Sequence, residues 1–190
     1  MRRFILVFLV LILAACLAAG VEENALAAKL VRLHVIANSD SDADQQLKLE
    51  LRDALLAASP EIFERAKNSE ELVHELENCA RRELERLGSD STVRVELGQE
   101  NYDTRDYATF SLPAGEYCSL RVTLGEGAGQ NWWCVLFPPL CFTTGQEFRD
   151  AADQAGLSED EMSLITGEDG GFEIRFRIIE LLEKLAGLLK

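Results

Sequence analysis

Two segments of this sequence look at first like ligand-binding loops, and neither has the residues that its chemistry requires. The acidic run Asp40–Asp44 would suit a calcium loop, but an EF-hand needs glycine at its sixth position and glutamate at its twelfth, where Gln45 and Leu51 stand. The glycine-rich segment Gly125–Gly129 lacks the G-x-G-x-x-G spacing and a lysine, and it leads into a predicted strand instead of a helix. We therefore expect helix capping at the first segment and a hairpin loop at the second.

The histidines offer little material for catalysis. His34 lies on a predicted strand, opposite its apolar face, and His74 occupies an exposed position of a predicted helix. Nucleophilic catalysis would need a thiolate or hydroxyl beside one of them, and the sequence contains no serine elbow, H-E-x-x-H or C-x-x-C pair. The sequence thus predicts a protein that is not an enzyme and has no catalytic, metal or cofactor residues. The competing hypothesis is an envelope hydrolase in which Asp40, Asp42 and His34 converge in one cleft.

The cysteines suggest a disulfide. Outside Cys16 there are four, namely Cys79, Cys118, Cys134 and Cys141. An even number in an oxidising compartment permits two disulfides, with three possible connectivities. Cys134 and Cys141 flank a double proline that can fold back, so we predict that they pair, which would contribute about 2 kcal/mol by loop entropy. Cys79 and Cys118 either form a second bridge between a helix and the sheet or are two small buried side chains.

Both tryptophans lie in one short segment beside a double proline. In a strand, Trp132 and Trp133 point to opposite faces, so one fills the core and the other finds cover elsewhere or stays at the surface. An exposed aromatic side chain beside a rigid loop is typical of a protein-binding hot spot; the alternative is that the terminal helices cover both rings. The predicted partner-binding residues are Trp132, Trp133, Phe137, Pro138, Pro139, Arg32, His34, Asn38 and Asp40.

Residues 1–20 have the composition of an export signal. Two arginines precede an uninterrupted apolar run, and the segment ends in small residues. Three outcomes stay open: cleavage after Gly20, retention as a single membrane anchor, or acylation of Cys16 within a lipobox-like Leu-Ala-Ala-Cys motif. Because the arginines hold the start of the chain on the cytoplasmic side, each outcome places residues 21–190 outside the cytoplasm.

The rest of the chain is strongly acidic. The sequence has 190 residues, of which 19 are basic and 33 acidic; residues 21–190 keep 17 of the basic and all 33 acidic ones, a formal charge of −16. This balance excludes nucleic acid as a partner, because phosphate binding needs clustered Lys and Arg. Anionic lipid repels such a body. We therefore expect membrane contact only through residues 1–20, and a single extracytoplasmic domain over residues 21–190.

The periodicity of the apolar residues predicts an α+β fold behind the export or anchor segment. Helical spacing predicts helices at 42–57, 60–67, 69–87, 145–155, 158–166 and 180–189. The second is opened by Ser59 as N-cap and Pro60 in its first turn, and the third by Ser69 as N-cap. Alternating or continuous apolar runs predict strands at 30–37, 93–97, 106–112, 118–124, 132–137 and 172–178. Because strands and helices come in separate runs, we expect an antiparallel or mixed sheet with helices packed on one face.

Several segments resemble one known family. The most specific is Asn131–Cys141, which reads N-W-W-C-V-L-F-P-P-L-C and follows a Gly-Glu-Gly; other similar segments are Arg32–Asp40, Leu112–Tyr117 and Ile174–Arg177. Over about residues 29–182, the chain is similar to the stage II sporulation protein R family. Cys16 and the pair Cys79 and Cys118 are not part of the recognised pattern.

The resemblance implies a role without catalytic residues. Members of that family have an amino-terminal export segment and act as an intercellular signal in endospore-forming bacteria. The signal is made in the forespore and exported into the space between the two cells, where it triggers a membrane-embedded protease of the mother cell that cleaves the pro-form of sigma-E. By this resemblance we expect the protein at the forespore membrane or in the intermembrane space, with that sigma-E-processing peptidase as its partner. The contact residues are not implied.

Overall fold

The computed structural model describes residues 25–140 and 145–167. The elements in chain order are β1 (Val31–Ile36), α2 (Asp42–Arg65), α3 (Ser69–Arg86), β2 (Val93–Tyr102), β3 (Arg105–Asp106), β4 (Ser111–Leu112), β5 (Gly115–Leu124), β6 (Asn131–Phe137), α4 (Gly145–Gln154) and α5 (Glu159–Thr166). They divide into two compact units. The larger unit contains residues 30–100 and 117–155, and the smaller contains residues 25–29, 101–116 and 156–167 of the described chain.

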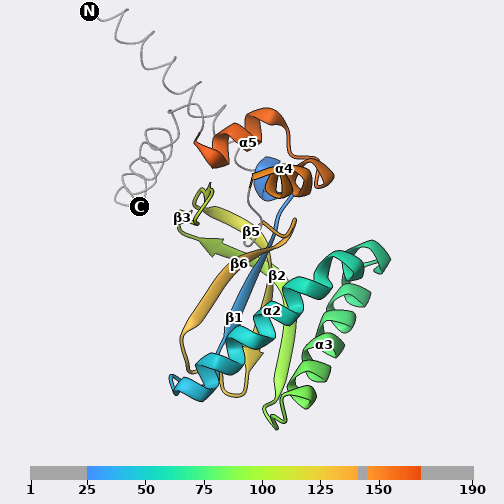
Figure 1. Ribbon diagram of the computed structural model, residues 1–190, viewed down its shortest axis with the longest axis vertical. Coiled ribbons are helices and arrows are strands. Elements are labelled where there is room, and N and C mark those ends of the chain that lie inside the picture. Colours follow the sequence, from blue (N-terminus) through green and yellow to red (C-terminus); the bar gives the residue numbers. More distant parts are fainter. Residues whose placement is uncertain (1–24, 141–144, 168–190) are drawn as a thin grey trace, which may run out of the picture. The chain divides into compact units, whose positions relative to one another are not determined.

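A four-stranded sheet forms the centre of the larger unit, in the order β2-β5-β1-β6. β1 pairs in parallel with β5 and antiparallel with β6, so the sheet is mixed. α2 and α3 lie side by side over one face of this sheet (Figure 1). The buried side chains between helices and sheet include Leu33, Val35, Leu51, Leu55, Leu76, Leu120, Val122 and Leu136. The predicted α+β class with a mixed sheet is therefore confirmed.

α2 continues through Ser59 and Pro60, where the sequence predicts that one helix ends and another begins. Pro60 has no N–H, so the carbonyl of Leu56, four residues earlier, loses its helical donor. The Ser59 hydroxyl replaces that donor: it lies 3.0 Å from Leu56 O and 3.3 Å from Leu136 O in β6. The predicted break is wrong, because Ser59 does not cap a new helix. Its hydroxyl supplies a donor to the unpaired carbonyl within α2 and also contacts the sheet at Leu136 O.

α3 has the predicted apolar face, with Leu72, Leu76, Ala80 and Leu84 buried. Its N-cap is Asn68, and the predicted cap Ser69 is the first helical residue. Asn68 Oδ1 accepts a hydrogen bond from the N–H of Glu71 at 2.8 Å. Asparagine and serine cap equally well, so local preference does not decide between neighbouring candidates.

In the smaller unit, the predicted strand over 106–112 is instead two short strands joined by a turn. β3 and β4 pair antiparallel in a sheet of their own, with Arg105 opposite Leu112. The N–H of Tyr107 donates to Phe110 O at 2.8 Å and closes the turn, and the two rings stack with centroids 4.6 Å apart. The apolar pattern fits one strand or two short ones equally well, so it did not reveal the turn.

The connection over residues 125–130 joins β5 to β6, but it does not form the predicted hairpin, because β1 lies between these two strands. The connection crosses the end of β1, where the N–H of Gly129 donates to Ala37 O at 2.9 Å. A Cβ on Gly129 would lie 2.2 Å from Ser39 O, so only glycine fits there. The glycine at position 129 therefore allows the backbone of this connection to pack closely against the backbone of Ser39.

α4 and α5 occupy the helices predicted at 145–155 and 158–166. α5 begins with a complete capping box between Ser158 and Glu161. The export segment 1–20, the strand 172–178 and the helix 180–189 lie outside the described residues and stay predictions. No helix in the described ranges is both long and apolar enough to cross a bilayer.

Candidate functional site

The sheet face opposite α2 and α3, here called the second face, carries a cluster of polar side chains. Side chains alternate along a strand, so the neighbours of the helix-facing Leu33 and Leu120 point to the second face. The register places His34 of β1 beside Arg121 of β5 and Trp133 of β6. The cluster, here called the Glu100 cluster, consists of Glu100, Ser119, Arg121, His34, Asn131 and Trp133.

Glu100 on β2 is the centre of this cluster. Its carboxylate accepts hydrogen bonds from the Ser119 hydroxyl and from Nε of Arg121, both at 2.7 Å, and Nη2 of Arg121 lies 2.6 Å away. Nδ1 of His34 lies 3.2 Å from Oε2. The Glu100 side chain is 16% exposed, so these charge-assisted contacts are partly shielded from water and correspondingly strong. One carboxylate thereby joins three neighbouring strands.

His34 connects the carboxylate to the edge strand β6. Nδ1 faces the Glu100 carboxylate, 3.2 Å from Oε2. Nε2 lies 3.1 Å from Asn131 Oδ1, and the imidazole stacks on Trp133 with ring centroids 5.5 Å apart and planes inclined by 22°. Trp133 is thus the tryptophan that points away from the helices, and the cluster spans all four strands.

Trp132 points to the helix side of the sheet and packs against the core, so the two tryptophans lie on opposite faces, as the alternation predicts. The Arg52 guanidinium of α2 lies 4.3 Å from the centroid of its ring and also pairs with Asp53. Phe137 stacks on Phe63 of α2 with centroids 4.7 Å apart. Two of the predicted partner-binding aromatic residues are therefore contacts between α2 and β6.

Two further candidates are buried. Arg32 lies on the second face, where its Nε donates to Cys134 O at 3.3 Å and its guanidinium lies 5.0 Å from the ring centroid of Tyr117. Pro138, directly after β6, is buried, and Pro139 is half-buried. Arg32 and Pro138 thus present little surface to a partner, whereas His34, Trp133 and Pro139 are half-buried.

Asn38 and Asp40 hold the connection that crosses the end of β1. Asn38 Oδ1 accepts a hydrogen bond from the N–H of Glu126 at 3.0 Å. Asp40 Oδ1 accepts one from the N–H of Gln130 at 2.8 Å. The buried Lys48 donates to Gln130 O at 2.9 Å, and burial lowers the pKa of its amine. These contacts position the first residue of β6 against the last residue of β1, and a direct role of Asn38 or Asp40 in partner binding stays a prediction.

The Glu100 cluster does not have the order of a serine triad. In a triad the histidine lies between the serine and the acid, whereas here Glu100 lies between Ser119 and His34. Ser119 is only 1% exposed, so its hydroxyl cannot meet a substrate from solvent. The arrangement holds side chains in place and does not activate a nucleophile.

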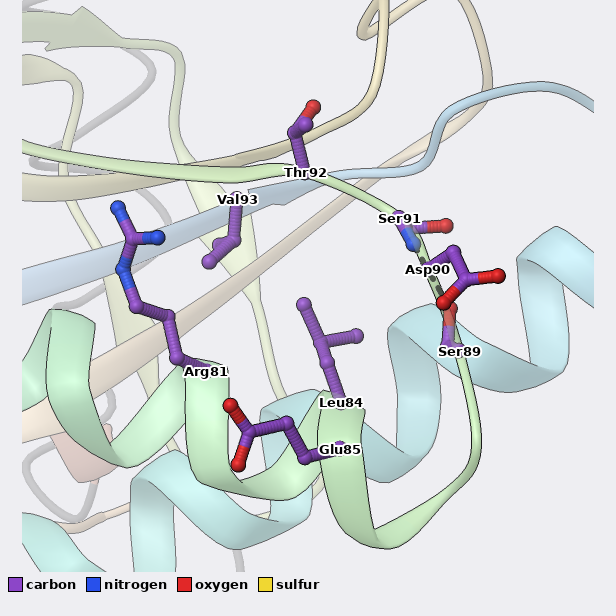
Figure 2. A pocket seen from close by; sticks show the side chains of 8 residues that line it. All are labelled: Arg81, Leu84, Glu85, Ser89, Asp90, Ser91, Thr92 and Val93. Atoms are coloured by element: carbon purple, nitrogen blue, oxygen red, sulfur yellow. Dashed lines mark hydrogen bonds between the residues drawn. The ribbon is translucent and has the colours of Figure 1, made fainter.

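A pocket in the larger unit lies away from the Glu100 cluster. Figure 2 shows it between the end of α3, with Arg81, Leu84 and Glu85, and the segment Ser89–Val93 that leads into β2. It encloses about 300 Å³. Asp40, Asp42 and His34 are not among its lining residues, so this pocket gives no support to the competing hydrolase hypothesis.

The acidic run after β1 caps a helix, as predicted. Ser41 is the N-cap of α2, and its hydroxyl accepts from the N–H of Asp44 at 3.2 Å. Hydrogen bonds from Ser39 and Asn38 lower the pKa of the Asp44 carboxyl. In the part of the chain that the structure describes, no group of three or more His, Cys, Asp or Glu side chains is placed to hold a metal ion.

The cysteines correct one prediction and leave another open. Cys79 and Cys118 are half-buried free thiols, and burial raises the pKa of both. The alternative of a bridge between them is therefore wrong: an even count of cysteines says nothing about the short Cα separation that a disulfide needs. Cys134 is fully buried and is not one of the free thiols. Its predicted partner Cys141 lies outside the described residues, so that pair stays a prediction.

The sequence did not single out Glu100, Ser119, Arg121 or Asn131. A polar face along residues 118–124 is visible in the sequence, but Glu100 lies beyond the predicted end of the strand at 93–97. The available signal was the spacing of Glu96 and Glu100, which places both on one face if the strand continues. The sequence does not show which strand lies beside β2, because this neighbour is set by the strand order of the folded sheet.

A family model and a relative named below are similar to this chain over most of its length. A family model described as stage II sporulation protein R matches residues 27–147, a range that includes the whole Glu100 cluster. The chain belongs to the stage II sporulation protein R family. A relative named stage II sporulation protein R, from Bacillus subtilis (strain 168), is 32% identical over 180 residues, covering 82% of this chain and 80% of that protein. No solved structure matches the chain. Membership of the stage II sporulation protein R family supports a role in sporulation.

Proposed function

We propose that this protein is an exported intercellular signal of endospore formation, which activates a membrane-embedded protease of the mother cell and so leads to processing of pro-sigma-E. The observation that carries the proposal is the family match over residues 27–147. In this proposal, residues 1–20 take the chain out of the forespore, and the protein works at the forespore membrane or in the space between the two cells. It acts as a ligand and not as an enzyme.

The Glu100 cluster supports a role in binding. A ligand activates a receptor only if it binds the active state more tightly than the inactive one. The hydrogen bonds of Glu100 and the stack of His34 on Trp133 hold side chains of four strands in one arrangement before any partner arrives. A preformed surface loses little conformational entropy on binding, so more of its contact energy is available to discriminate between receptor states.

A disulfide between Cys134 and Cys141 belongs to the same proposal. Cys134 is not one of the free thiols, and an exported protein meets an oxidising environment. The bridge would close the loop that contains Pro138 and Pro139, directly after β6. Its function would be to hold that loop against the end of the strand.

Co-expression of the chain with the candidate protease and its pro-sigma substrate in a non-sporulating host tests the proposal. We expect cleavage of the substrate, read by immunoblot, to rise with the full-length chain and to stay at background with a version that lacks residues 1–20. Both versions must accumulate to equal levels for the comparison to count. Background cleavage with the correctly exported full-length chain would disprove the signalling role.

The two tryptophans should separate binding from folding in this assay. Trp133→Ala removes the ring that stacks on His34 and should lower activation, with a small loss of stability because this side chain is half-buried on the second face. Trp132→Ala leaves a cavity beside α2 and should lower the free energy of unfolding by about 3 kcal/mol. Unchanged activation by Trp133→Ala would remove the second face from the proposal.

A further inference from the structure

The end of the sheet where β1 stops and β6 starts combines the stacked rings with exposed acidic side chains. The second-face residues at this end, here called the patch, are His34, Asn131 and Trp133. Three exposed acids lie at this end: Asp40 and Glu126 in the two connections that meet there, and Asp42 as the first residue of α2. Hydrogen bonds keep these connections beside the patch: Gln130, whose N–H binds Asp40, directly precedes Asn131.

The basic side chains near this end offset only part of this charge, because the Lys48 amine interacts electrostatically with Asp40 and not with Asp42 or Glu126. Lys48 is buried and is engaged by Gln45 Oε1 at 2.6 Å and by Gln130 O at 2.9 Å. Arg121 is paired with Glu100 inside the cluster. Arg94 is exposed, but it lies on β2, which is separated from β1 by β5. The end of the sheet is therefore locally negative, on a body whose formal charge over residues 21–190 is −16.

We infer that the patch and its acidic rim form the contact surface for a basic protein segment, which in the proposed function is an extracytoplasmic segment of the membrane-embedded partner. This inference rests on the proposed function for the identity of the partner. The aromatic stack supplies a rigid apolar centre of the kind found at hot spots. The rim supplies complementary charge, which steers association and selects a positive partner over the anionic lipid around it.

Charge reversal in the co-expression assay tests this surface. Asp40 is left unchanged because it holds Gln130, and the two other rim acids are replaced in the double variant Asp42→Lys/Glu126→Lys. The control is Glu64→Lys/Glu70→Lys, which changes the net charge by the same amount at exposed positions of α2 and α3. The pairs are matched, because Asp42 and Glu70 both lie in the first turn of a helix.

We expect the rim variant to lower activation about tenfold or more, since like charges brought together across an interface cost several kcal/mol, and the control to stay within about twofold. Equal losses in both variants would show that only the overall charge matters, and equal activity in both would show that the rim makes no contact; either result overturns the inference. These failures differ from a failure of the proposed function, in which the wild-type chain itself does not stimulate cleavage.

Co-purification of the full-length chain with the solubilised protease gives a second readout. The yield of the complex should fall as salt rises from about 50 to 500 mM, because screening weakens contacts between exposed charges, and the fall should be shallower for the rim variant. A yield that does not change with salt, or that falls equally for the wild type and the rim variant, would show that the rim charges make no contact and would overturn the inference. Thermal unfolding of each variant checks that the fold is retained.

Discussion

Glu100 is predicted to be the side chain on which the second face depends, and replacing it by glutamine tests this directly. Glu100→Gln keeps the size of the side chain but removes its charge and places an amide among donors. The hydroxyl of Ser119 and Nδ1 of His34 are 2.7 and 3.2 Å from the carboxylate and lose a charged acceptor. Arg121, with 43% of its side chain exposed, can turn to water.

The size of the effect follows from that difference in exposure. A hydrogen bond to a charged group contributes about 1.5–3 kcal/mol, and Glu100→Gln replaces two such bonds, from Ser119 and from His34, whose side chain is 14% exposed, by weaker neutral contacts. An exposed ion pair such as that of Arg121 contributes about 0–1 kcal/mol. We therefore expect Glu100→Gln to lower the free energy of unfolding by about 3 kcal/mol, which corresponds to a fall in Tm of about 6–12 °C for a chain of this length.

Urea denaturation followed by tryptophan fluorescence is the assay. Glu96→Gln is the matched control, because Glu96 lies on the same strand and the same face but is exposed, so its replacement should change stability by less than about 0.5 kcal/mol. The emission of Glu100→Gln should also shift, since the ring of Trp133 loses the histidine that Glu100 orients. Identical unfolding midpoints for the two variants would refute the argument that Glu100 holds the four strands together.

Two further predictions concern positions away from the cluster. Gly129→Ala should destabilise the protein by about 1–3 kcal/mol or more, because the added Cβ would lie 2.2 Å from Ser39 O. The control Gly98→Ala, whose Cβ would have nothing within 4 Å, should be neutral or slightly stabilising. Thermal unfolding of both variants measures the difference, and equal Tm values would contradict the packing argument. The second prediction concerns Glu161. Burial acts to raise the pKa of its carboxyl, but the hydrogen bonds from Lys29 and Ser158 outweigh this effect and bring the pKa below the usual 4.5. A lowered folded-state pKa means stability that is present above pH 4.5 and lost as the pH falls through the folded value. The unfolding free energy of Glu161→Gln should therefore fall less steeply below pH 4.5 than that of the wild type. Parallel curves would show that the Lys29 pair at 2.6 Å adds no stability.

The correct and incorrect sequence predictions differ by the range of the interactions involved. The face of α3, the capping of α2 by Ser41 and the alternation of Trp132 and Trp133 depend on residues within a few positions of each other, and all were predictable. The break at Ser59 was not, because the Ser59 hydroxyl finds its acceptors in its own helix and at Leu136, 77 residues away. The local pattern is the same for a cap and for a side chain that repairs a helix around proline.

The sequence alone determined the family, the α+β class and the apolar faces of the strands predicted at 30–37, 93–97 and 118–124, because hydrophobic periodicity is a local property of the chain. Only the tertiary structure decided that β1 lies between β5 and β6, which turns the expected hairpin at Gly125–Gly129 into a crossing. That order also brings Glu100 to His34, residues 66 positions apart. Such contacts depend on which strands become neighbours, and strand order follows from the packing of the whole sheet and not from any segment within it.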